Sequence, residues 1–411
     1  MNNQELFNYR IKVVNDAIAL KEPDHVPVAP MLGCLPYHLF HSSFKNSMYH
    51  FEDASRSVIE FFQKYHPDAH NYNPMWSGKA NELAGSTMID WPGRPGSKVP
   101  DTSTYQVIEH EYMTEDEYPE LLDDFTGYML RKYIPRAFPN LSGLSQLSLN
   151  PSSILGSKFL SGIASEPVME AMETLRQIGI ENRKAEAATS VLNAELAQMG
   201  FPPMKTGFGE APFDILSDYF RGTMGTFSDL MECPDLIEKA CDLFADIQIQ
   251  SWQYFRKDMP VKRVYFPLHK GMDGFMSPAQ YETLYWRPLR KVIDALVDLG
   301  VCPILYGEGP YNTRIDQMTD IPVGKCIIHF EKADMAKAKR VLGDKACISG
   351  NLSIYLLEHG TREQVVEETK KLLDICAPGG GYIFDTNACM GAAKEENIDA
   401  MFETLEQYGK Y

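Results

Sequence analysis

Two side chains that can bind a metal or move a proton follow short apolar runs in the C-terminal half of the chain. Glu308 comes after the run 301–305, and His329 comes after the run 325–328. Short apolar runs are typical of buried parallel strands, and α/β proteins place their chemistry at the carboxyl ends of such strands. A polar stretch long enough for a crossover helix separates the two runs. We therefore expect Glu308 and His329 on neighbouring strand ends, as two ligands of a zinc ion.

Three other polar residues occupy similar positions. Glu210 ends the run 204–210, and His269 follows the run 263–268. Each is a candidate for a third ligand, because zinc accepts carboxylate oxygen as well as imidazole nitrogen. Tyr306 lies just before Glu308 and is a candidate to orient a substrate oxygen or to donate a proton to it.

The elements that must position these residues are eight candidate strands with helices between them. The strands are expected at 25–31, 67–73, 204–210, 263–268, 301–305, 325–329, 345–349 and 380–384. Regular alternation of strands and helices predicts a parallel sheet, and eight such units predict a TIM barrel. We expect one domain over residues 1–411, with an N-terminal helical extension at 2–20.

An insertion at about 81–135 interrupts this alternation. Residues 107–112 alternate in the manner of a strand, and Thr114 followed by Glu117 is the signature of a capped helix start. We expect a β-hairpin lid over a pocket. Further on, the Ser/Gly-rich segment 140–162 is expected to be a mobile loop, and the chain from Pro167 to about 198 a helix.

Composition limits the classes of partner. The 411 residues are 44% hydrophobic and 23% charged, with a net charge of −17. This acidity argues against nucleic acid or an anionic membrane as a partner. The sequence has no signal peptide and no apolar run long enough to span a bilayer, so a cytoplasmic location is expected. The eight cysteines are spread singly, which fits a reduced compartment.

Several stretches resemble one superfamily. They are Pro23-Asp24-His25-Val26-Pro27-Val28, Ala211-Pro212-Phe213-Asp214 through Arg221-Gly222, Gly350-Asn351-Leu352 with Gly360-Thr361-Arg362-Glu363, and Gly379-Gly380-Gly381-Tyr382-Ile383-Phe384 with Glu396-Asn397-Ile398. The chain resembles the uroporphyrinogen decarboxylase-like barrels, which also include the corrinoid-dependent methyltransferases of anaerobes. Trp91-Pro92-Gly93 and Met113-Thr114-Glu115-Asp116-Glu117-Tyr118 are more similar to the methyltransferase branch.

The resemblance has implications for the site. The decarboxylases carry arginines in the segment that here is 31–38, which contains no Arg or Lys, so tetrapyrrole decarboxylation is disfavoured. The thiol methyltransferases carry His-x-Cys where this chain has Tyr306-Gly307-Glu308, and a second Cys that is similar in position to Cys389. The resemblance therefore implies Cys389 as the third zinc ligand, with Glu210 or His269 as substitutes. A site with fewer sulfur ligands fits the related enzymes that take a methyl group from a methyl ether.

The expected activity is that of the methyltransferase I component of an anaerobic O-demethylase. It moves a methyl group from a methoxylated aromatic compound to a Co(I) corrinoid, while zinc on the ether oxygen offsets the charge of the leaving phenolate. The chain has no Asp-x-His-x-x-Gly signature, so a partner corrinoid protein is expected to carry the cobalamin. Tyr37, Trp76, Phe208 and His269 are the expected substrate-binding residues. The alternatives are a methylcorrinoid:thiol or pterin methyltransferase, a metal-free decarboxylase or lyase, and a non-catalytic scaffold.

Overall fold

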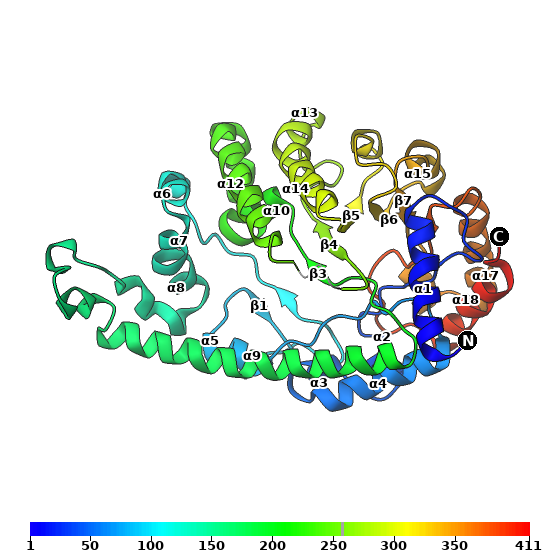
Figure 1. The fold of residues 1–411 in the computed structure, drawn as a ribbon, viewed down its shortest axis with the longest axis horizontal. Coiled ribbons are helices and arrows are strands. Elements are labelled where there is room, and N and C mark those ends of the chain that lie inside the picture. The colour runs from blue at the N-terminus through cyan, green and yellow to red at the C-terminus, as the bar shows by residue number, and fades with distance from the viewer. Residues whose placement is uncertain (256–258) are drawn as a thin grey trace.

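The centre of the protein is a six-stranded parallel sheet whose strands lie in chain order, β3-β4-β5-β6-β7-β8. The computed structural model describes residues 1–255 and 259–411 (Figure 1). The strands are β3 (Gly207–Phe208), β4 (Arg263–Leu268), β5 (Cys302–Pro310), β6 (Ile327–Lys332), β7 (Cys347–Ser349) and β8 (Tyr382–Ile383). Each overlaps a predicted strand, and β5 and β6 pair directly, as expected. Their register places Tyr306 beside His329, so Glu308 lies farther along β5.

Two extended segments link the edges of this sheet. Val28 forms a parallel bridge with Phe384 next to β8, and His70 forms one with Pro203 near β3. The amide of Asp68 also donates to the carbonyl of Val28 at 2.8 Å. The predictions of regular strands at 25–31 and 67–73 were wrong, because prolines in and beside these segments remove the N–H donors that a ladder needs. The strand order and these links give a TIM-barrel type of α/β fold.

Amphipathic helices cover the outside of the sheet. Helix α14 buries Leu289, Val292, Ile293 and Leu296, a spacing that places them on one helical face. Helices α12, α14 and α15 lie above the sheet in Figure 1, and α1, α17 and α18 lie to its right. Their bounds are α1 (Asn3–Ile18), α12 (Pro234–Trp252), α14 (Arg287–Asp298), α15 (Met335–Leu342), α17 (Arg362–Cys376) and α18 (Glu395–Tyr408). The predicted N-terminal helical extension is confirmed, and its start has a capping box formed by Asn2 and Glu5.

The inserted region contains the expected antiparallel pair. Strands β1 (Ile89–Asp90) and β2 (Gln106–Val107) pair with each other and with no other strand of the described residues. Thr114 and Glu117 form the predicted capping box at the start of a 3₁₀ turn (Glu115–Glu117) that continues into α6 (Tyr118–Asp123). Helix α9 (Glu166–Gln198) follows the insertion and runs across the lower part of the molecule in Figure 1.

Two local predictions were wrong. The segment 140–162 contains 3₁₀ turns at Pro139–Gln146, Pro151–Ser153 and Ser157–Gly162 rather than a continuous loop. Between β5 and β6, only a 3₁₀ turn at Ile315–Met318 replaces the expected crossover helix. Polar side chains there bond to the loop after β4 instead: Arg314 donates to the carbonyl of Gly271 at 3.0 Å, and Thr313 donates to Asp273 at 2.6 Å.

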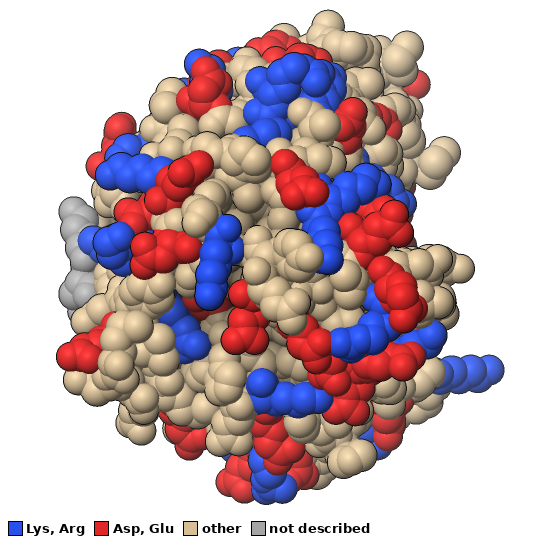
Figure 2. Space-filling model, turned by 90° about the vertical axis from the view of Figure 1, so that its right-hand side faces the viewer, with Lys and Arg blue, Asp and Glu red and all other residues tan. Residues whose placement is uncertain are grey.

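The remaining elements complete the outer layer. They are α2 (Leu35–Leu39), α3 (Phe44–Tyr49), α4 (Phe51–Tyr65), α5 (Gly78–Ala84), α7 (Phe125–Tyr128), the π-helix Met129–Tyr133, α8 (Ile134–Ala137), α10 (Pro212–Asp214), the π-helix Ile215–Arg221, α11 (Gly222–Glu232), α13 (Pro278–Gln280), the π-helix Tyr281–Trp286 and α16 (Ile354–His359). No described helix is both long enough and apolar enough to cross a bilayer. On the face in Figure 2, acidic and basic side chains are interspersed.

Candidate functional site

A chain of acidic and imidazole groups connects the ends of β4 and β5 with the segment after β3. The Nε2 atom of His269 lies 3.4 Å from Oε2 of Glu308, and its Nδ1 atom lies 2.5 Å from Oδ2 of Asp218. Burial opposes the charged form of His269, but the hydrogen bonds to Asp218 and Glu308 outweigh it and raise its pKa to about 11. The imidazole is therefore a cation at neutral pH, held between two carboxylates.

Asp214 holds the backbone segment that carries His269. Its side chain is fully buried, and it accepts hydrogen bonds from the amides of His269 and Lys270, at 2.8 and 2.9 Å, and from the hydroxyl of Tyr285, at 2.7 Å. Because three donors converge on one carboxylate, the turn after β4 has little freedom. Asp214 thus positions His269 without touching the open side of the site.

Glu210 lies in the same region and has an unpaired oxygen. Its Oε1 accepts a hydrogen bond from Tyr219 at 2.7 Å, whereas its buried Oε2 has no partner among the described residues. Burial raises the pKa of Glu210 to about 7, although the Tyr219 hydrogen bond opposes the rise. Both Asp218 and Tyr219 come from the π-helix Ile215–Arg221, a helix type that is frequent at functional sites. A buried carboxyl oxygen without a partner is open to a ligand's proton or to a cation.

Aromatic rings form a wall beside these groups. Tyr265 stacks at 6.0 Å from Tyr306 and lies 6.1 Å from Phe208, measured between ring centroids. Phe208 is 58% exposed, so one face of the wall is open. Trp76 is 41% exposed and stacks on Tyr105 at 4.8 Å, and the charges of Glu308 and Glu210 act on the Tyr105 hydroxyl. An exposed aromatic face beside a few polar groups is typical of a small-molecule site.

His329 lies in a different environment from the one expected of a metal ligand. It is buried, its Nε2 donates to the carbonyl of Thr386 at 2.8 Å, and its Nδ1 lies 3.3 Å from Oδ2 of Asp385. Burial lowers the pKa of His329 to about 4 and raises that of Asp385 to about 8. Both groups are neutral at pH 7, so the Asp385 acid can donate to the free lone pair of Nδ1. Both ring nitrogens of His329 are thus engaged.

Among the described residues, no hydrogen bond or ion pair joins any two of the predicted ligands Glu308, His329 and Cys389. In residues 1–255 and 259–411, no group of three His, Cys, Asp or Glu side chains is arranged to hold a metal ion. Burial raises the pKa of the Cys389 thiol to about 11. The three-residue ligand set therefore stays a prediction, and the structure brings Glu308 together with His269, the substitute ligand.

The donor chemistry of this region suits zinc. The carboxylate of Glu308 and the imidazole of His269 are adjacent, and the unpaired oxygen of Glu210 acts electrostatically on the same histidine. Oxygen and nitrogen donors of these types are ordinary zinc ligands. Because the described residues offer no arranged third ligand beside Glu308 and His269, zinc at this site stays a prediction.

The hydroxyl groups of two other predicted site residues are hydrogen-bonded or buried away from the Glu308–His269 pair. The hydroxyl of Tyr306 donates to the carbonyl of Asn387 at 3.0 Å, and burial raises its pKa. Tyr37 is buried in the core, where desolvation also raises the pKa of its hydroxyl. Their predicted roles, in proton donation and in substrate binding, stay predictions.

Sequence reasoning missed Asp218, Asp214 and Lys205. Asp214 and Asp218 lie four and eight residues after Glu210, and the spacing of four between them places two carboxylates on one helical face. Lys205 is a lone basic residue in an otherwise mostly apolar approach to β3. Both patterns can be recognised in the sequence alone.

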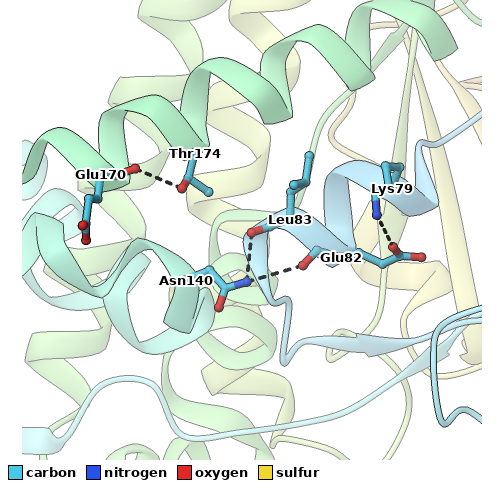
Figure 3. Close-up of a pocket in the computed structure, with 6 residues that line it drawn as sticks. All are labelled: Lys79, Glu82, Leu83, Asn140, Glu170 and Thr174. Carbon is cyan, nitrogen blue, oxygen red and sulfur yellow. Dashed lines mark hydrogen bonds and ion pairs between the residues drawn. The ribbon is translucent and has the colours of Figure 1, made fainter. Parts of the chain in front are cut away.

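A surface pocket of about 590 Å³ lies away from this region, between α5, the turn Pro139–Gln146 and α9 (Figure 3). Its polar groups bond to one another: Lys79 pairs with Glu82 at 2.9 Å, and Asn140 donates to the carbonyl of Leu83 at 3.0 Å. Because these groups do not converge on the pocket's interior, it is a weaker candidate than the end of the sheet.

Comparison with known proteins gives the family. No curated protein sequence matches the chain. Among solved structures, a methyltransferase from Methanosarcina mazei has the same fold with a TM-score of 0.62, at 14% identity, over 97% of this chain and 98% of that one. Residues 165–408, more than half of the chain and including β3 to β8, match the family described as uroporphyrinogen decarboxylase (URO-D). The chain therefore belongs to the uroporphyrinogen decarboxylase family.

Proposed function

We propose that this protein is a methyltransferase that takes the methyl group of a methoxylated aromatic compound and passes it to the Co(I) corrinoid of a separate corrinoid protein. The observation that carries the proposal is the Asp218–His269–Glu308 chain beside an open aromatic wall. Cleaving an aryl methyl ether leaves a phenolate, and its developing charge must be offset at the oxygen. A cationic imidazole and carboxyl groups at the strand ends are suited to that task.

Each residue has a distinct role in this proposal. Asp214 and Asp218 orient His269, and the imidazolium holds a proton near the leaving oxygen. Phe208 and Tyr265 stack with the substrate ring and exclude water from it. Zinc bound by Glu308 with either His269 or the predicted His329 and Cys389 would act as a Lewis acid at the ether oxygen. The paired strands β1 and β2 are proposed as part of a lid.

The test is a methyl-transfer assay. Purified protein, zinc, a reduced corrinoid protein and 4-methoxybenzoate or 2-methoxyphenol are mixed, and methylation of the corrinoid is followed by its visible absorbance. Glu308→Gln is expected to abolish most of the rate. Glu406→Gln, on the exposed face of α18, is the matched control and is expected to behave as wild type. No corrinoid methylation with any methoxylated aromatic would contradict the proposal.

One observation favours a second function, methyl transfer to a thiol. The charge of Cys389 raises the pKa of the Cys34 thiol, and the Cβ of Cys389 lies 3.0 Å from where a side chain on the neighbouring Gly33 would begin. Two sulfur ligands suit a thiol-activating zinc site. Methylated corrinoid plus a small thiol, with demethylation as the readout, separates the two functions. Loss of that reaction in Cys34→Ser would support the thiol reaction.

A further inference from the structure

Helix α11 exposes an apolar face to solvent. Met224 and Met231 are 79% and 80% exposed, and Phe227 between them is 39% exposed. Because these positions are three and four residues apart, the three side chains lie on one side of the helix, in a stripe about 10 Å long. Single apolar side chains are ordinary on a protein surface, but a contiguous group of them is typical of an interaction surface.

The opposite side of α11 is fixed in the core. Thr226, Asp229 and Leu230 are buried there. The carboxylate of Asp229 pairs with the guanidinium of Arg221 at 2.6 Å and accepts a hydrogen bond from the hydroxyl of Tyr118 at 2.7 Å. The helix is therefore held firmly in place, while the flexible side chains of its exposed methionines can adapt to the surface of a partner.

The start of α11 is joined to the candidate site. The hydroxyl of Thr223 accepts a hydrogen bond from the ammonium of Lys270 at 3.0 Å, and the same ammonium lies 3.3 Å from Oδ1 of Asp218. The ring of Phe227 stacks on that of Phe275, which follows β4, at 4.5 Å between centroids. A molecule bound to the exposed face of α11 would therefore lie beside the end of the sheet that carries the site.

The chain around this apolar face is acidic. Segments 105–118 and 222–235 contain no Lys or Arg, and they lie together, since the amide of Thr223 donates to Glu109. Arg221 and Lys239 each pair with one carboxylate of these segments, so the rim as a whole stays negative. The exposed carboxylates of this acidic rim are Glu109, Glu111, Glu115, Asp116, Glu232 and Asp235.

This charge pattern distinguishes between the kinds of occupant. The acidic rim would repel an anionic membrane. A second copy that docked through the same face would place one acidic rim against another. A protein that surrounds its own apolar contact with Lys and Arg side chains is complementary to both parts of the surface.

We propose that the exposed face of α11 is the docking surface for the corrinoid protein. Met224, Phe227 and Met231 make the apolar contact, and basic side chains of the corrinoid protein face the acidic rim. This proposal rests on the proposed methyltransferase function, because that reaction requires the cobalt of a second protein to reach the site. A partner seated on α11 lies next to the contact between Lys270 and Asp218 and can extend over the strand ends.

The experiment measures binding between the full chain and the corrinoid protein of the methyl-transfer assay, with its cobalt as Co(II) and without a methyl donor. Calorimetry is expected to show about 10- to 100-fold weaker binding by the double variant Met224→Ser/Met231→Ser than by wild type. Glu232→Lys and added salt are each expected to weaken binding, because the rim attracts basic side chains. Met169→Ser, at a 52% exposed methionine on α9, is the matched control and is expected to bind as wild type does.

Methyl transfer to free cob(I)alamin separates docking from catalysis. This small acceptor needs no docking surface, so the double variant is expected to keep the wild-type rate with it. With the corrinoid protein as acceptor, the KM for that protein is expected to rise about 10-fold or more at nearly constant kcat. Because both methionines are exposed, the melting temperature of the double variant is expected to match that of wild type.

Three results would overturn the proposal. The first is binding of the corrinoid protein that is absent in wild type or equal in wild type and the double variant. The second is an equal loss of rate with both acceptors, which would make the face structural. The third is a wild-type dimer that the double variant dissociates in sedimentation, which would assign the face to a second copy.

The two proposals fail separately. If the corrinoid protein binds through α11 but accepts no methyl group from any methoxylated aromatic, the methyltransferase assignment fails and the docking surface stands. If wild type and the double variant methylate the corrinoid protein with the same KM and kcat, the docking surface fails and the methyltransferase assignment stands.

Discussion

Two of the protein's histidine–aspartate pairs, His269–Asp218 and His329–Asp385, are in opposite charge states. His269 and Asp218 lie at the strand ends with Glu308, and hydrogen bonding overcomes burial to raise the pKa of His269 to about 11. His329 and Asp385 lie deeper, where burial lowers the histidine pKa to about 4 and raises the aspartate pKa to about 8. The same two residue types therefore give a charged pair and a neutral pair.

The difference comes from what else each pair touches. Asp218 also lies 3.3 Å from the ammonium of Lys270, and this charge and His269 favour its ionised form although burial opposes it. Asp385 accepts hydrogen bonds from the amides of Met31 and Thr386, both at 2.7 Å, and from the Thr386 hydroxyl at 3.3 Å, but among the described residues no cation lies against it and the fully desolvated carboxyl keeps its proton. A histidine at a strand end is thus not by itself evidence of a ligand or an acid. The second carboxylate at the first pair, Glu308, is the feature on which its proposed reactivity depends.

Replacing each histidine with glutamine is expected to give the largest difference in activity between the two pairs. His269→Gln removes the group proposed either as the acid or, in its neutral form, as a zinc ligand, and is expected to lower kcat/KM for methyl transfer by about 10²- to 10⁴-fold. His329→Gln keeps a polar side chain next to Thr386 and is expected to have a much smaller effect. Zinc content, measured by plasma emission spectroscopy, is expected to fall in His269→Gln and to persist in His329→Gln. The reverse pattern would favour the predicted set of Glu308, His329 and Cys389.

A second prediction concerns the support of the charged pair. Asp214→Ala leaves two backbone amides and the Tyr285 hydroxyl without their acceptor, so it is expected to lower the free energy of unfolding by about 3 kcal/mol. Urea denaturation measures this change. Asp374→Ala, an exposed aspartate on α17 without an ion pair, is the control and is expected to stay within about 0.5 kcal/mol of wild type. An equal loss in both variants would contradict the structural role of Asp214.

Sequence patterns predicted the strands that carry the site better than the contacts within it. Apolar runs located β4 to β8, and alternation predicted that β5 and β6 are neighbours. Patterns did not show that the segments 25–31 and 67–73 form isolated bridges rather than regular strands, because proline spacing and long-range pairing decide that together. Nor did they distinguish His269 from His329. That choice depends on carboxylates such as Asp218, brought in by a segment distant in the chain.

The pH dependence of stability is expected to differ in sign between the two histidines. His269 has a folded pKa of about 11 against an ordinary value of 6.5, so its stabilising contribution is complete below pH 6.5 and is lost as the pH rises toward 11. His329 has a folded pKa of about 4, so its contribution is complete above pH 6.5 and is lost as the pH falls toward 4.

Urea denaturation at a series of pH values tests both signs. His269→Gln is expected to flatten the alkaline side of the stability profile, and His329→Gln the acid side. The Asp385 carboxyl stabilises the folded state only while it is protonated, so its contribution is lost as the pH rises from about 4 to about 8. Asp385→Asn is expected to reduce this loss. If His269→Gln flattened the acid side instead, the charge states assigned to the two pairs would have to be exchanged.

The smallest expected effect concerns the aromatic wall, which separates the two pairs along the sheet. Phe208→Leu keeps an apolar side chain but removes the flat face beside Tyr265, so KM for a methoxylated aromatic is expected to rise about 2- to 10-fold with little change in kcat. Tyr254→Leu alters an exposed aromatic residue that precedes the start of β4, at the other end of the sheet, and is expected to change neither constant. A fall in kcat for Phe208→Leu at constant KM would mean that the ring contacts the transition state. The aromatic wall would then contribute to the methyl-transfer step at the His269–Asp218 pair as well as to substrate binding.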